Sequence, residues 1–137
     1  MNRHNKRLKQ ISILVVEDDA DTRDLLSILF ENEGATVVTA ATVPSALQKL
    51  NQMEPDVLVV DIGLPEHNGY VFIGRVRALK DPRKRNLPAI ALTAYSTPSD
   101  RDTALTSGFQ RFMSKPFETG ALVDAILDVA RLKEEAA

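Results

Sequence analysis

Carboxylates stand directly after two short apolar runs of the sequence. The run ILVV at 13–16 leads into Glu17, Asp18 and Asp19, and the run VLVV at 57–60 leads into Asp61. Short runs rich in Val and Ile are typical of buried strands in a parallel sheet. Open α/β sheets bind ligands at the carboxyl ends of their strands, so three of these acids are expected at one edge. Carboxylates gathered there repel each other unless a hard cation lies among them, which indicates a cation site.

Two further polar residues are expected at the same edge. Thr93 ends the run PAIALT at 88–93, and Lys115 follows a short expected strand at 110–113. Taken singly, Thr93 would be a strand-end hydroxyl and Lys115 a surface lysine. Together with the acids they suit phosphoryl transfer, because an ammonium and a hydroxyl both stabilise phosphoryl oxygens. Asp61 is then the nucleophile that would form an aspartyl phosphate.

The acids divide into different expected roles. Glu17, Asp18 and Asp61 can hold Mg²⁺, a hard ion that prefers carboxylate, carbonyl and water oxygens. Asp19 suits the N-cap of the helix that follows, and Asp21 suits its first turn.

The elements that must position these residues alternate along the chain. Strands are expected at 11–16, 36–40, 56–61, 88–93 and 110–113, and helices at 20–33, 43–53, 70–79, 98–107 and 118–132. This alternation predicts an α/β fold with a doubly wound, five-stranded parallel sheet. The basic stretch KDPRKRN at 80–86 is expected to be a loop, and the helix at 98–107 has few large apolar residues.

Length and composition exclude several classes of protein. The 137 residues suit one domain, of which 44% are hydrophobic and 26% charged. The net charge of −2 gives no overall attraction to nucleic acid, and the absence of cysteine excludes disulfides and thiolate sites. No apolar stretch is long enough for a membrane span, and the basic start lacks the apolar region of a secretory signal. A cytoplasmic protein is therefore expected.

The sequence predicts three segments. Residues 1–10 are expected to be a basic tail or linker, 11–133 the folded domain, and 134–137 a C-terminal tail. The alternative for the first segment is an arm that contacts nucleic acid or a membrane.

Four motifs in this order carry a family resemblance. They are VVEDD after the first strand, DIGLPEHNG after the third, ALTA in the fourth, and SKPF after the fifth. With this spacing the chain resembles the receiver domain of two-component response regulators over residues 11–132. The resemblance implies a flavodoxin-like (βα)5 fold with strand order 2-1-3-4-5.

The resemblance also implies a role for each site residue. Asp61 would be the phosphorylated aspartate, and Thr93 and Lys115 would contact the phosphoryl oxygens. Asp18 would bind Mg²⁺ directly and Glu17 directly or through water. The backbone carbonyl of Gly63 would complete the protein ligands, and the peptide bond between Lys115 and Pro116 would be cis.

A switch and a tuned lifetime are further implications of the resemblance. Thr93 would move toward the phosphoryl group and Phe112 would swing inward. The alternative for Phe112 is an ordinary core residue of the fifth strand. The second residues after Asp61 and after Thr93 set the lifetime of the phosphoryl bond in this family. These are Gly63 and Tyr95, and the pair predicts slow-to-moderate self-dephosphorylation.

The implied partner is a histidine kinase or a histidine phosphotransfer protein, with an output partner that the sequence does not identify. The chain would be a monomer or weak dimer and not an enzyme in the usual sense. It could be a stand-alone regulator or a receiver excised from a hybrid histidine kinase.

Two other classes of protein are disfavoured by residues at the expected site. A phosphohydrolase with an aspartate nucleophile needs a second Asp two residues later, where this chain has Gly63. A flavodoxin-like nucleotide or flavin binder wants glycine or hydroxyl residues after the first strand, where Glu17, Asp18 and Asp19 would repel phosphate.

Overall fold

The computed structural model describes residues 6–63, 68–94 and 97–136. The strands are β1 (Ser12–Val16), β2 (Thr36–Ala40), β3 (Val57–Asp61), β4 (Ala89–Thr93) and β5 (Arg111–Ser114). The helices are α1 (Ala20–Asn32), α2 (Val43–Gln52), α3 (Gly69–Arg77), α4 (Pro82–Arg85), α5 (Pro98–Ser107) and α6 (Thr119–Ala136). Among the described helices, none is both long and apolar enough to cross a bilayer.

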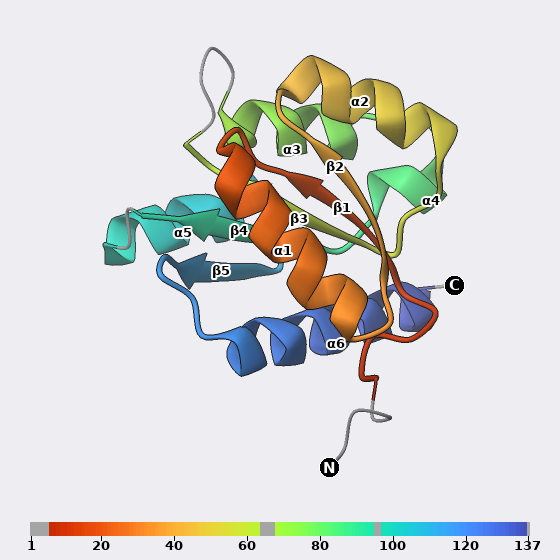
Figure 1. Ribbon diagram of the computed structural model, residues 1–137. Helices are drawn as coiled ribbons and strands as arrows, with labels where there is room; N and C mark the ends of the chain where they lie inside the picture. Colours follow the sequence, from red (N-terminus) through yellow and green to blue (C-terminus); the bar gives the residue numbers. More distant parts are fainter. Residues whose placement is uncertain (1–5, 64–67, 95–96, 137) are drawn as a thin grey trace.

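The strands form one parallel sheet in the order β2-β1-β3-β4-β5, with helices on both sides (Figure 1). This confirms the predicted doubly wound α/β fold and its strand order. The expected strand and helix ranges agree with the structure to within a few residues, with one exception. Residues 82–85, expected to lie in a loop, form α4, where the Asp81 side chain accepts a hydrogen bond from the Arg83 N–H as N-cap.

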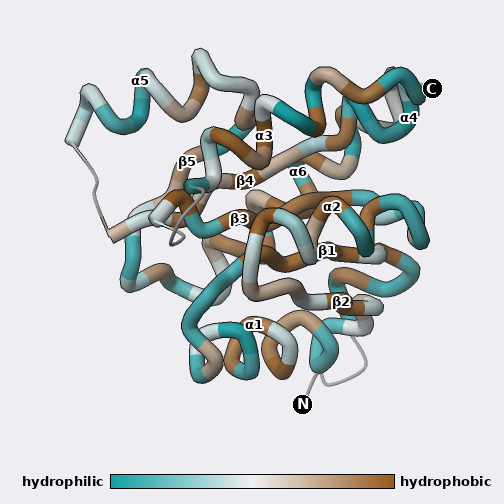
Figure 2. Tube along the Cα trace, turned by 90° about the horizontal axis from the view of Figure 1, so that it is seen from above, coloured by the Kyte–Doolittle hydropathy of each residue, from teal (hydrophilic) through white to brown (hydrophobic). Residues whose placement is uncertain are grey.

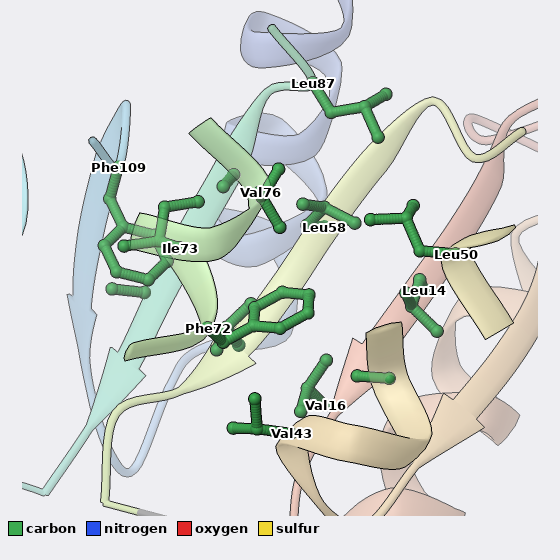
Figure 3. Packing of buried hydrophobic residues seen from close by; sticks show 14 of the residues in the cluster. Leu14, Val16, Val43, Leu50, Leu58, Phe72, Ile73, Val76, Leu87 and Phe109 are labelled. Atoms are coloured by element: carbon green, nitrogen blue, oxygen red, sulfur yellow. The ribbon is translucent and has the colours of Figure 1, made fainter. Parts of the chain in front are cut away.

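Alternate residues of the central strands supply two separate halves of the core. Leu14, Leu58 and Ala89 face one side and pack with α2 and α3, where Phe72 lies over the sheet (Figure 3). Their neighbours face the other side and pack with α1 and α6. Because side chains alternate along a strand, runs that are apolar throughout are buried on both faces. Figure 2 shows the same arrangement, with hydrophobic segments along the strands and a largely hydrophilic α5 outside them.

Polar side chains fix where the helices begin. The N-caps of the five helices α1 to α5 are Asp19, Thr42, Asn68, Asp81 and Thr97, each accepting a backbone N–H from the first turn. These bonds satisfy amides that a helix leaves without partners at its start. The Asp19 cap confirms the role predicted for that residue and starts α1 immediately after the acids of the β1 end.

The described part of the N-terminal segment packs on the domain, where a solvated tail or linker was expected. Leu8 is fully buried in the core half formed with α1 and α6, and its N–H donates to the Glu33 carbonyl at 2.8 Å. The Arg7 guanidinium pairs with Asp124 of α6. Gly34 makes room for this segment, because a Cβ there would lie 3.2 Å from Lys9 Cα, and its φ of +95° also favours glycine.

Arg77, the last residue of α3, forms hydrogen bonds with residues near the ends of α4 and α5, at the edge of the sheet opposite the acids. Its guanidinium donates to the carbonyl of Gly108, the C-cap of α5, from Nη2 at 2.7 Å and from Nε at 3.2 Å. It also donates to the Arg85 carbonyl at 2.8 Å and to Gln110 Oε1 at 3.3 Å. The C-terminal end of α5 is therefore bonded to α3. Among the described residues, the side-chain hydrogen bonds in the first turns of α5 stay within Thr97–Thr103.

Candidate functional site

Buried polar side chains gather at one edge of the sheet. In the described ranges there are three of them, with exposed fractions of 1% for Glu17, 8% for Asp61 and 1% for Thr93. Burial of a carboxylate is costly unless it is paired or bonded. The buried polar side chains of the described ranges therefore form a polar site at this edge.

The strand register explains why these residues meet. Val16 pairs with Val60, Asp61 with Leu92, and Thr93 with Ser114, so the carboxyl ends of four strands finish almost level. The backbone continues this alignment beyond the strands, since the Lys115 N–H donates to the Thr93 carbonyl at 2.7 Å. The residues that follow β1 and β5 are thus brought beside Asp61, as expected for a ligand site of an open parallel sheet.

Three carboxylates converge at this edge. One oxygen from each of Glu17, Asp18 and Asp61 lies within 4.8 Å of the others. Glu17 and Asp61 are buried, whereas Asp18 is exposed to solvent. An all-oxygen set that is open on one side suits Mg²⁺, which binds through one or two carboxylates and keeps several waters. The chemistry of the donors therefore fits the magnesium site that the sequence predicts.

Lys115 lies within this acidic cluster. Its Nζ is 2.6 Å from Glu17 Oε1 and 3.7 Å from Asp61 Oδ2. Burial raises the pKa of Glu17 to about 7, against the opposing effect of the Lys115 hydrogen bond, and nearby Asp61 adds to the increase. Burial alone would lower the pKa of Lys115, but its bond to Glu17 and the charge of Asp61 outweigh this and raise it. The lysine is a fixed positive charge beside the acids.

Backbone groups orient two of the carboxylates. The Gly63 N–H donates to Asp61 Oδ1 at 3.0 Å, and the Asp19 N–H donates to Glu17 Oε2 at 3.2 Å. The structure therefore places Gly63 against Asp61 through its amide, whereas the sequence assigned a role to its carbonyl. The predicted cis peptide between Lys115 and Pro116 is present.

Gly69 is a residue of the site that sequence reasoning did not single out. A Cβ at this position would lie 2.9 Å from the Asp61 carbonyl oxygen and 2.9 Å from Ile62 Cα. Its N–H also donates to the Ile62 carbonyl at 2.9 Å. The first turn of α3 can approach the end of β3 this closely only when the side chain is absent, and this contact fixes the backbone that carries Asp61.

Arg23 is a second contributor that the sequence analysis missed. Its Nη1 donates to the carbonyl oxygens of Glu17 and Asp18, both at 2.9 Å. In the sequence, Arg23 is an ordinary helical arginine five or six residues after Asp18 and Glu17, and this spacing does not predict a contact with them. Only the three-dimensional course of the turn between β1 and α1 brings the guanidinium back onto it.

The expected switch residues lie on neighbouring strands, Thr93 at the end of β4 and Phe112 in β5. Thr93 lines a cavity of about 250 Å³ together with Gly63 and Tyr70. Phe112 pairs with Ala91, is half-buried, and packs against the core half formed with α2 and α3. It also lines a separate cavity of about 490 Å³ between β5, α5 and α6. Phe112 is thus a core residue with open space beside it. Tyr95 lies outside the described residues.

Comparisons with known proteins agree with this geometry. An uncharacterized 14.6 kDa protein of Leptolyngbya boryana is 48% identical over 116 residues, covering 85% of this chain and 87% of its own length. The phosphate regulon transcriptional regulatory protein PhoB of Escherichia coli is 34% identical over 119 residues. That match covers 87% of this chain and 51% of PhoB, so the chain spans about half of the length of PhoB.

A solved structure shares the fold. The receiver domain of the sensor histidine kinase PA1611 from Pseudomonas aeruginosa has a TM-score of 0.80 and 26% identity to this chain. The match covers 88% of this chain and 98% of that domain. Residues 13–127 match the family described as the response regulator receiver domain. The chain therefore belongs to the response regulator receiver domain family, whose members act in two-component signalling.

Proposed function

We propose that this chain accepts a phosphoryl group on Asp61 from a phosphohistidine, with Mg²⁺ bound beside it, and changes conformation to signal to a partner. The observation that carries the proposal is the convergence of Glu17, Asp18, Asp61 and Lys115, with buried Thr93 at the end of the neighbouring strand β4. The donor would be a histidine kinase or a histidine phosphotransfer protein. The relative PA1611 is a sensor histidine kinase whose receiver has magnesium in its active-site cleft.

The transfer exchanges one phosphorus bond for another. An oxygen of the Asp61 carboxylate attacks phosphorus, the bond between phosphorus and the histidine nitrogen breaks, and the donor imidazole keeps the electron pair and takes up a proton. Glu17, Asp18 and Asp61 would hold Mg²⁺, with the Gly63 carbonyl as a further proposed ligand. Mg²⁺ supplies positive charge that offsets the charge of the transferred group.

Backbone and side-chain groups around Asp61 would orient the reactants. The Gly63 N–H donates to Asp61 Oδ1, which leaves Oδ2 as the oxygen that faces Lys115 at 3.7 Å. Lys115 is then placed to stabilise the incoming phosphoryl oxygens, and the Thr93 hydroxyl to donate a hydrogen bond to one of them.

The proposed signal passes through Thr93, Phe112 and α5. Thr93 would move toward the phosphoryl group, and Phe112 would turn further into the protein beneath α5. In α5 a single residue, Ala104, is buried, so the helix has little apolar contact that resists a shift. The absence of a hydroxyl on Phe112 means that its position responds to packing alone.

The proposed docking surface for the phosphodonor is the exposed side of α1. Leu25 is 49% exposed and Ile28 is 56% exposed on this helix, unusually high values for large apolar side chains. A groove of about 310 Å³ beside them is lined by Leu25, Leu29, Phe117 and also Lys115. An apolar surface that reaches a residue of the phosphoryl site suits a donor that must present its phosphohistidine at Asp61.

The context of the domain is open to two proposals. Its relatives include a transcriptional regulator and a sensor histidine kinase, so the chain could serve as a stand-alone regulator or as the receiver of a hybrid kinase. We propose that the chain acts in the cytoplasm as a monomer or weak dimer. We also propose that it signals to an output partner still to be identified, without direct contact with nucleic acid.

Mass spectrometry after incubation with acetyl phosphate and Mg²⁺ tests the proposed function. We expect one phosphoryl adduct, which is lost in Asp61→Asn and when the metal is chelated. Asp21→Asn is the matched control, since it removes an exposed acid of α1 and should leave the adduct intact. Turnover of a phosphate ester, or copurification of a yellow cofactor, would instead support the two rival classes.

A further inference from the structure

Asp18 is held differently from the other two acids of the site. The Glu17 carboxylate accepts hydrogen bonds from Lys115 and from the Asp19 N–H, and the Asp61 carboxylate accepts one from Gly63. In the described part of the chain, the Asp18 carboxylate has no such bond. One of its oxygens nevertheless lies within 4.8 Å of those of the other two acids. The position of this exposed side chain must therefore be set through its backbone.

Arg23 controls that backbone. A single nitrogen, Nη1, donates to the carbonyl oxygens of Glu17 and Asp18, each at 2.9 Å. Two bonds from one nitrogen to consecutive carbonyls restrict the rotation of the peptide unit that joins the two residues. Arg23 is itself fixed, because it lies in the first turns of α1 and its N–H donates to the Asp19 carbonyl at 2.9 Å.

We propose that Arg23 is a positioning residue of the metal site, which directs the Asp18 carboxylate toward Glu17 and Asp61 by holding the carbonyls of the β1–α1 turn. This inference rests on the proposed function, because it assigns a role toward Mg²⁺ at the same site. Groups that orient metal ligands affect metal affinity by about 10-fold to 100-fold when they are changed. Arg23 belongs to this class although it would not touch the ion.

The charge of Arg23 makes the inference testable, because its charge would weaken Mg²⁺ binding whereas its positioning of Asp18 would strengthen it. A guanidinium near a cation site repels the cation, so its removal would strengthen Mg²⁺ binding if charge alone mattered. Loss of positioning would weaken binding instead. Arg23→Lys keeps the charge but replaces the guanidinium, and with it Nη1, by a compact ammonium on a different stem, and Arg23→Gln loses the charge. Only the positioning role predicts the same direction for both variants.

Titration calorimetry with MgCl₂ in the absence of a phosphodonor measures the effect directly. We expect both Arg23 variants to bind Mg²⁺ about 10-fold more weakly than the natural chain. Arg75→Gln is the matched control, because Arg75 is an exposed arginine on α3 and its loss should leave the affinity unchanged. Unchanged or tighter binding in Arg23→Gln would overturn the inference, as would failure of the natural chain to bind Mg²⁺.

A double-mutant cycle separates positioning from a general loss of structure. If Arg23 acts through Asp18, the Asp18→Ala change removes its effect, and the double variant should bind Mg²⁺ as weakly as Asp18→Ala alone. Additive losses would show that Arg23 acts elsewhere and would contradict the inference. A natural chain that binds Mg²⁺ in this way but takes no phosphoryl group would refute the proposed function and leave the role of Arg23 intact.

Discussion

The ammonium of Lys115 lies 2.6 Å from Glu17 Oε1, whereas its distance to Asp61 Oδ2 is 3.7 Å. In this state the lysine is therefore bonded to a proposed metal ligand and only approaches the proposed phosphoacceptor. Entry of a cation beside Glu17 would compete for the same carboxylate and release the lysine toward Asp61. We therefore expect the pair to couple occupation of the proposed metal site to the position of Lys115 at the proposed phosphoryl site.

The variant Lys115→Gln tests this coupling. Because Glu17 is freed and a positive charge is lost, Mg²⁺ should bind at least as tightly as in the natural chain. Acceptance of the phosphoryl group should nevertheless slow by about 100-fold, the scale expected for one lost electrostatic contact to a transition state. Calorimetry and the rate of adduct formation at saturating Mg²⁺ measure the two effects, and an unchanged rate would contradict the role of Lys115.

The raised pKa of Glu17 predicts a pH dependence of stability without metal. Burial raises it from 4.5 to about 7, so the folded chain holds a proton between these values that the unfolded chain has released. The free energy of unfolding contributed by this group should therefore fall as pH rises through this window. Urea unfolding with a chelator present measures it. Glu17→Gln should remove this part of the slope, and an identical slope in both chains would argue against the assignment.

Gly69→Ala should destabilise the protein and impair the site together. The new methyl group would lie 2.9 Å from the Asp61 carbonyl oxygen, and overpacking of this kind costs about 1–3 kcal/mol. Gly74→Ala is the matched control, because none of the described atoms outside its own helix backbone lies within 4 Å of a Cβ there. Alanine in that exposed helical position should stabilise the chain by about 1 kcal/mol. Denaturant unfolding and adduct formation distinguish the two, and equal effects would exclude the proposed clash.

The residue at position 63 is expected to influence the lifetime of the phosphoryl bond. Among the described residues, a Cβ at this exposed position would meet one atom, Asp61 Oδ1 at 3.7 Å, so the first side-chain carbon of Gly63→Asn causes no backbone clash there. Because glycine has no side chain to orient an attacking water, we expect slow-to-moderate loss of the label in the natural chain. Decay after removal of the donor measures the lifetime. Loss much faster in the natural chain than in Gly63→Asn would reverse this prediction.

The amides of α5 should exchange with solvent faster than those of α1. In α1 the side chains of Leu26 and Phe30 are buried, whereas in α5 only the methyl group of Ala104 is buried. Fewer apolar contacts lower the free energy of local opening. Hydrogen exchange resolved by residue checks this expectation, and equal protection of the two helices would count against α5 as the movable element.

Most of the architecture follows from local patterns in the sequence. The apolar runs before Glu17 and Asp61 identify strands that are buried on both faces, and their alternation with amphipathic segments predicts the parallel sheet. Once the sheet is known, the acids, Thr93 and Lys115 must meet, because parallel strands bring their carboxyl ends to one edge. These predictions succeed since each depends on neighbours in the chain or on a general rule of topology.

The contacts that the sequence did not reveal depend on the exact path of the chain. Leu8 has only polar neighbours in a basic segment, so no periodicity indicates that it is buried. The helix α4 has a capping aspartate and an early proline, but its three basic residues show no apolar face. Arg23 and Gly69 make their contacts with backbone atoms. Every residue has these atoms, so the type of the partner residue does not reveal the contact.

The attachment of α5 through Arg77 has a mechanical consequence. A helix bonded to α3 at its last turn can rotate about that end, and ten residues span about 15 Å. A rotation of about 10° would then displace the first turn by roughly 2.5 Å and leave the last turn almost in place. A partner that contacts Arg101 would therefore experience a larger displacement than one that contacts Leu105. If α5 moves on phosphorylation as proposed, the position of a binding surface along α5 would set how large a displacement the partner detects.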